Sequence, residues 1–380
     1  MKNPLQLLFV ILITSLIFFS CKPSKEETDY LVTADRKPMV TNLGNNIIVP
    51  RYQALNDAVN AFDAQVQIFT SSPSSENLID LRTKFYASYV AWEYVASFEF
   101  GPATGSSVNL GTKLINAFPT DTTLIKNKIN QNLTSIPVSS GSNYSGFPAI
   151  DYLLFWKNLS TQQIVDSFQV SILASKRCNF LKILSSNLKT RINTTYSEWT
   201  SGSTPFNVLY SNNTGLDLGS STSQTINMMV ADLENIKNFK IGLPINVSQN
   251  VVIDNENVYP FRCEGYHSDS SLVLAKASME AFRKLFKGVS PSGIDGSGFD
   301  DYLVSIGREG LSKQIEDKIE LIQTKLDLIQ NPISIAIQTP AGKQAVKNVY
   351  QEMLDLITLM KVDFPSAIGV IISYGDTDGD

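Results

Sequence analysis

Histidine is almost absent from this 380-residue chain, which contains a single one, His267. A catalytic zinc site uses roughly three protein ligands together with an open position and a general base. One histidine cannot supply the usual imidazole ligands, so the count excludes a His-rich zinc site whatever the fold. A site for calcium, magnesium or ferric iron stays open, because such ions take carboxylate and carbonyl oxygens.

Cysteine is also scarce, and after Cys21 only Cys178 and Cys263 remain. Two cysteines do not make a disulfide framework, and whether they pair stays open. Cys178 lies in a helical pattern and is typical of a small buried hydrophobe.

An excess of charge of either sign is missing as well. The chain has 31 basic and 36 acidic residues that are mixed along its length, and the net charge is -5. Without a basic stripe, nucleic acid is not predicted as a partner. The sequence also has no glycine-rich phosphate loop and no serine nucleophile elbow, so nucleotide binding and serine-hydrolase chemistry have no support.

The N-terminus is typical of a secretory signal peptide over residues 1–20. Lys2 gives a positive start, an apolar run covers 5–19, and the small residue Ser20 precedes Cys21. This run is too short and wrongly flanked for a spanning helix. A cysteine after the cleavage point resembles a bacterial lipobox, so we expect lipidation of Cys21 and a polar tether over 21–43. An ordinary signal peptide with an incidental cysteine is the alternative.

Helical periodicity dominates the rest of the chain. Apolar residues recur at spacings of three and four, and capping residues and Gly or Pro breaks separate the runs. No alternating strand–helix pattern appears, although 251–253 could be a short strand without a clear partner. The sequence therefore predicts an all-α fold with two helical bundles, at 44–202 and 203–380. The expected helices are 51–69, 73–96, two short ones within 110–132, one long helix over 160–199, then 222–236, 268–285, 311–329 and 339–360.

The stretch from Gly146 to Trp156 follows a Ser/Gly-rich loop and combines Gly146, Pro148 and Asp151 with an apolar run. It resembles the signature of the imelysin family, Gly-x-His-x-x-Glu followed by Tyr-Leu-Leu. Here Gly146 is kept, Pro148 stands at the histidine position, Asp151 at the glutamate position, and Tyr152 begins the apolar run. Further segments resemble the family in the same order, namely 92–102, 241–245 and the tail 370–380.

The resemblance implies two four-helix-bundle-like domains with the signature site at their interface. In the family, the motif histidine and glutamate are taken as metal ligands or catalytic groups. Pro148 has no ring nitrogen, so it cannot take over that role, whereas Asp151 keeps a carboxylate with a shorter reach. We therefore assign no catalytic residue, and we regard Gly146, Pro148 and Tyr152 as the scaffold of the motif.

Several other acids and the single histidine are candidates to bind a ligand or metal beside Asp151. Glu99 is preferred over Glu93, although both could lie on a solvated helix face. His267 and Asp269 lie at an expected helix start, where His267 could equally be a surface capping residue. The C-terminal Asp376 and Asp378 resemble half of a calcium-binding loop that lacks its distal glutamate. They could fold back to the site or form a frayed end.

These observations favour a non-catalytic, imelysin-like lipoprotein of the bacterial envelope, on the periplasmic or surface face of the outer membrane. Other members of the family are linked to iron uptake. By this resemblance, we expect the protein to bind a metal ion or an iron complex and to serve iron uptake. A metallopeptidase with an altered, oxygen-ligand site is one alternative. An adaptor that binds the proteins of a surface uptake complex is the other.

Overall fold

The computed structural model describes residues 34–105, 110–137, 142–248, 251–252 and 257–373. These residues belong to one compact unit that begins at Ala34. The signal peptide, Cys21, Asp376 and Asp378 lie outside the described residues, so the predictions for them stay predictions. The boundary expected near residue 203 also stays a prediction.

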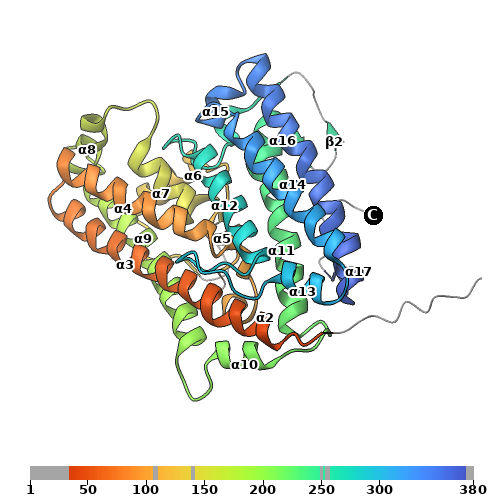
Figure 1. Cartoon of the computed structure of the whole chain (residues 1–380). Coiled ribbons are helices and arrows are strands. Elements are labelled where there is room, and N and C mark those ends of the chain that lie inside the picture. The colour runs from red at the N-terminus through yellow and green to blue at the C-terminus, as the bar shows by residue number, and fades with distance from the viewer. Residues whose placement is uncertain (1–33, 106–109, 138–141, 249–250, 253–256, 374–380) are drawn as a thin grey trace, which may run out of the picture. The chain divides into compact units, whose positions relative to one another are not determined.

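Helices make up nearly all of the regular structure in the described residues, which confirms the all-α class (Figure 1). No helix in this part of the chain combines the length and the apolar character needed to cross a membrane. The elements are α2 (Lys37–Asn42), η1 (Leu43–Ile48), α3 (Val49–Ser71), α4 (Ser75–Glu93), η2 (Ala96–Phe98), η3 (Gly101–Thr104), α5 (Thr112–Ile115), α6 (Thr122–Asn130), η4 (Ser142–Tyr144), α7 (Gly146–Phe155), α8 (Thr161–Gln169), α9 (Ala174–Thr200), α10 (Phe206–Asn212), α11 (Ser221–Asn235), η5 (Ile236–Gly242), η6 (Leu243–Ile245), β1 (Val247–Ser248), β2 (Val251–Val252), η7 (Pro260–Arg262), α12 (Ser271–Phe286), α13 (Phe299–Ser305), α14 (Glu309–Asp327), α15 (Ile333–Ala336), α16 (Pro340–Thr358), η8 (Leu359–Asp363) and α17 (Phe364–Ile368).

Two groups of helices pack around a continuous apolar core. Helix α3 packs against α4 and α9, and the apolar row expected on α3 is buried. Helices α11, α14 and α16 form the second group together with the π-helical segment η5. Helix α12 contacts both α4 and α14, so it joins the two groups (Figure 1). The residues that face each other across this junction include those of the candidate site.

The long helix expected over 160–199 is wrong, because two helices, α8 and α9, occupy this segment. The capping box of Ser160 and Gln163 opens α8 as expected. At the break, the hydroxyl of Ser171 accepts a hydrogen bond from the amide of Leu173, and such side-chain bonds compete with helical ones. Ile172, at this break, is apolar but 98% exposed.

Smaller differences concern the start and end of elements. Helix α2 begins within the segment expected as a tether, because the apolar Met39 and Val40 are buried there. Helix α4 begins at Ser75 instead of residue 73, because Ser74 caps it by accepting from the amide of Asn77. The short strand β2 does have a partner, since it pairs antiparallel with β1.

Core packing on α9 can be tested with two leucines of opposite exposure. Leu184→Ala removes a side chain that is 1% exposed, so it should lower the free energy of unfolding by about 2–5 kcal/mol. Leu328→Ala makes the same change at a side chain that is 76% exposed, and should cost less than about 0.5 kcal/mol. Urea denaturation measures both, and equal losses would contradict this packing.

Candidate functional site

The signature stretch forms helix α7, and the position of Gly146 explains why a glycine begins it. Gly146 has a φ of +72°, a backbone conformation that residues with a side chain rarely adopt. A Cβ atom at this position would lie 2.0 Å from the carbonyl oxygen of Ile115. Phe147 then stacks on Tyr89, with ring centroids 4.7 Å apart. These contacts fix the start of α7 against α4 and α5.

Asp151 lies on the buried face of α7 and holds the loop that precedes α12. Its Oδ2 atom accepts a hydrogen bond of 2.9 Å from the backbone amide of His267. The other oxygen, Oδ1, is buried without a hydrogen-bond partner. Burial raises the pKa of Asp151 to about 7, although the hydrogen bond from His267 opposes this shift.

The single histidine faces the signature helix and is not a surface capping residue. The ring of His267 lies 5.2 Å from that of Tyr152, and its Nδ1 accepts a long hydrogen bond of 3.5 Å from the amide of Lys157. Burial and the nearby charge of Lys157 lower the pKa of His267 to about 4. The imidazole is therefore neutral at pH 7. Asp269 forms an ion pair with Lys157.

A cavity of ≈ 270 Å³ lies between α7 and this loop. Its wall includes the motif residues Pro148 and Asp151 together with His267, and its other lining residues are Phe118, Thr120, Thr122, Trp156, Phe261, Cys263, Gly265 and Tyr266. The structure therefore brings together the motif and the only histidine, as the candidate site requires.

The donor set at Asp151 does not fit a bare metal ion. Among the described residues, no group of three or more His, Cys, Asp or Glu side chains is placed to hold one. Asp151 offers a single free oxygen, and Asp269 already pairs with Lys157. A protein site for calcium or magnesium needs several oxygen ligands around the ion.

Glu99 does not join this cavity. Its Oε1 atom accepts hydrogen bonds from the backbone amide and the hydroxyl of Thr112. Glu99 lines another cavity, of ≈ 440 Å³, together with Thr112 and Asp232. Burial raises the pKa of the Glu99 carboxyl group, against the hydrogen bonds from Thr112.

Buried charged and polar groups form a cluster around Lys240, which we call the Lys240 cluster. The ammonium nitrogen of Lys240 lies 2.6 Å from Oε2 of Glu93 and 2.6 Å from Oε2 of Glu264. Ser278 donates to the same oxygen of Glu93 at 2.6 Å, and Asn116 donates to Oε1 of Glu264 at 2.5 Å. The cluster therefore connects α4, α5, η5, α12 and the loop before α12.

These contacts and the burial of the cluster shift the pKa values of Glu93 and Lys240. Burial and repulsion by Glu264 raise the pKa of Glu93 well above its usual value, against the pull of Lys240. Burial opposes the charge of Lys240, but Glu264 and Glu93 together raise its pKa.

The expectation of a solvated face was wrong for Glu93, which is 0% exposed, and for Glu99. A sequence signal for Glu93 did exist, because it follows Phe85 and Tyr89 at spacings of four and so continues their buried row. Lys240 lies two residues before the Gly-Leu-Pro segment at 242–244. No local pattern could show that these two residues meet.

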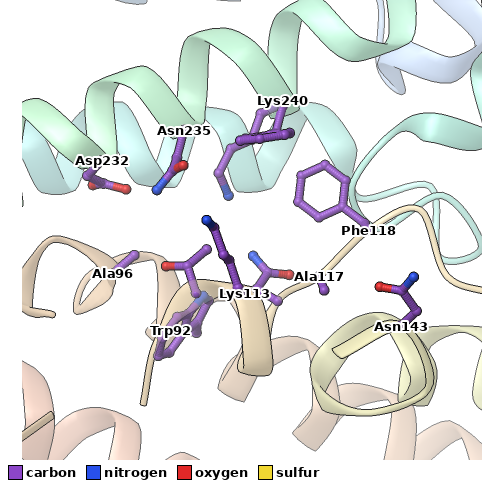
Figure 2. Close-up of a pocket in the computed structure, with 12 residues that line it drawn as sticks. Trp92, Ala96, Lys113, Ala117, Phe118, Asn143, Asp232, Asn235 and Lys240 are labelled. Carbon is purple, nitrogen blue, oxygen red and sulfur yellow. The ribbon is translucent and has the colours of Figure 1, made fainter. Parts of the chain in front are cut away.

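A third cavity, of ≈ 330 Å³, lies beside the Lys240 cluster (Figure 2). Asp232, Asn235 and Lys240 project from one wall, which α11 and η5 form. Trp92, Ala96, Lys113 and Ala117 lie on the opposite wall, and the remaining lining residues are Thr112, Asn116, Phe118, Asn143 and Phe239.

The described residues thus define an all-helical protein whose buried polar groups lie where two groups of helices meet. The Imelysin family model (Peptidase_M75) matches residues 48–360, so the chain belongs to the imelysin family. No curated protein matches the chain.

Two solved structures share the fold. One is of a protein described as an iron-regulated protein A precursor from Parabacteroides distasonis ATCC 8503, with a TM-score of 0.68, 18% identity, and coverage of 87% of this chain and 94% of that one. The other is of an imelysin-like protein from Psychrobacter arcticum 273-4, with a TM-score of 0.66, 16% identity, and coverage of 89% and 97%. At such identities the likeness concerns the fold alone.

The raised pKa of Asp151 predicts a specific pH dependence of stability. Between pH 4 and its pKa of about 7, the folded chain holds a proton at Asp151 that the unfolded chain releases, so this group stabilises the fold less as pH rises. Asp151→Asn removes this effect. The difference in unfolding free energy, variant minus wild type, should therefore grow from pH 5 to pH 7, by at most roughly 1.4 kcal/mol per pH unit. Parallel curves in urea denaturation at each pH would contradict the shift.

Proposed function

We propose that this chain is a non-catalytic binding protein of the bacterial envelope, which holds an iron complex at the Asp151 cavity and serves iron uptake. The observation that carries the proposal is the buried, unpartnered Oδ1 of Asp151 beside a proline at the motif's histidine position. The motif's acid is kept and remains free to bind, while the imidazole that a catalytic site would use is missing.

An iron complex suits this cavity better than a bare ion. A single protein carboxylate can occupy one coordination position of iron while the complex's own ligands fill the others, and ferric iron takes oxygen ligands. The cavity of ≈ 270 Å³ has room for a small complex. Because the pKa of Asp151 is about 7, its carboxylate becomes available as pH rises through that value.

Support for the link to iron and for the envelope location comes from outside the cavity. One structural neighbour is described as an iron-regulated protein A precursor, and this chain shares its fold. The sequence at Ser20 and Cys21 resembles a lipidation site. A lipid anchor at Cys21 would hold the protein at the membrane.

Equilibrium dialysis of the purified full-length chain tests the proposal. Wild type should retain ferric citrate more strongly at pH 8 than at pH 6, and should retain neither free calcium nor free zinc. Asp151→Asn keeps the shape of the side chain but removes its charge, so it should weaken retention of ferric citrate by about tenfold or more, as expected for loss of a charged ligand.

A peptidase assay on a broad panel of protein substrates separates this proposal from its rival. Wild type and Asp151→Asn should both show no cleavage that a chelator abolishes. Chelator-sensitive cleavage that Asp151→Asn removes would establish a metallopeptidase instead. Failure of wild type to retain ferric citrate would remove the iron-binding role.

A further inference from the structure

The cavity beside the Lys240 cluster is separate from the Asp151 cavity, with which it shares only Phe118 among the described lining residues. At ≈ 330 Å³ it lies near the lower end of the range for small-molecule sites, about 300–1,000 Å³. Neither Asp151 nor His267 lines it. Its chemistry therefore has to be considered apart from the motif.

Its walls present hydrogen-bond donors that need an acceptor. The side chain of Trp92 is only 1% exposed, and its indole Nε1 atom is buried without a hydrogen-bond partner. Lys113 stands at the cavity edge, and its ammonium group points into the cavity without an ion pair to a described residue (Figure 2). A buried donor left unpaired is unfavourable, so a ligand that accepts from it gains affinity.

A second positive charge reaches the cavity from the opposite wall. The ammonium group of Lys240 points toward the same space (Figure 2), where its contacts with Glu93 and Glu264 hold its position. Because Lys240 already donates to three oxygens of Glu93 and Glu264, the donors left for a ligand are the ammonium group of Lys113 and the indole N–H of Trp92. These two donors favour a negatively charged acceptor with more than one oxygen. A carboxylate meets this requirement.

The other lining residues indicate which further groups the ligand carries. Trp92, Phe118 and Phe239 offer aromatic surface, and Ala96 and Ala117 are small and apolar. Aromatic rings pack well against such a surface. Asp232 also lines the cavity, and its Oδ2 atom accepts a hydrogen bond of 2.5 Å from Ser97. A hydroxyl or amino group on the ligand would pair with the Asp232 carboxyl group.

We propose that this cavity binds a small aromatic carboxylate that carries a hydroxyl or amino group next to its carboxylate. The carboxylate accepts from the ammonium group of Lys113 and from the indole N–H of Trp92. The aromatic ring packs against the aromatic side chains of the wall, and the hydroxyl or amino group donates to Asp232. This site goes beyond the proposed binding of an iron complex and does not depend on it.

Isothermal titration calorimetry on the full-length chain tests the site with three probes. 3-Phenyllactate carries the carboxylate, the hydroxyl group and the ring, and should bind saturably. Lactate lacks the ring and 2-phenylethanol lacks the carboxylate, so each should bind at least about tenfold more weakly, since each loses one of the two main contacts.

Two variants locate the binding. Lys113→Met removes an exposed ammonium group without disturbing the core, and should weaken 3-phenyllactate binding by about tenfold, the scale of a charge-assisted hydrogen bond. Trp92→Phe keeps an aromatic ring but removes the N–H, and should also weaken binding. Lys84→Met removes an exposed lysine of α4 outside the cavity, and should leave binding unchanged.

Asp151→Asn separates this site from the iron site, because it should leave 3-phenyllactate binding intact while weakening retention of ferric citrate. Absence of saturable 3-phenyllactate binding to wild type would overturn the inference. Binding that Lys113→Met does not change, or equal affinity for 2-phenylethanol, would overturn it as well. Should Trp92→Phe fail to fold, the result with Lys113→Met still decides.

Discussion

The arrangement of this protein depends on one buried ammonium group. Lys240 lies within hydrogen-bond distance of Glu93 and Glu264, which come from α4 and from the loop before α12. A buried charge without partners is very unfavourable, so these segments have to meet around Lys240 once η5 is buried. Lys240 also lines the cavity beside the cluster, and Glu264 belongs to the same loop as His267.

The signature helix keeps the glycine of the family motif and carries Pro148 where the motif has histidine. Gly146 and Phe147 still fix the start of α7 through the close approach to Ile115 and the stacking on Tyr89. Asp151 still reaches the loop at His267, but one of its oxygens is engaged in holding that loop. With Pro148 in the histidine position, the site keeps a shaped cavity and one free acceptor.

The sequence predicted the helices and the family well, because apolar spacing and capping are local signals. Thr339 and Pro340 begin α16 as expected, and Ser160 caps α8. The break at Ser171 was missed because it depends on a side-chain hydrogen bond that periodicity does not show. The Lys240 cluster could not be predicted from local pattern, since Glu93 and Lys240 are 147 positions apart. Only the packing of α4 against distant segments brings them together.

A double-mutant cycle on Lys240 and Glu264 tests the central interaction most directly. Lys240→Met alone leaves the Glu264 charge buried without its partner and should lower the free energy of unfolding by about 3–5 kcal/mol. Adding Glu264→Gln should recover part of this loss, because one of the two carboxyl groups that lost Lys240 then carries no charge. Urea denaturation of the wild type, both single variants and the double variant measures the coupling. A double variant whose loss equals the sum of the single losses would contradict the account.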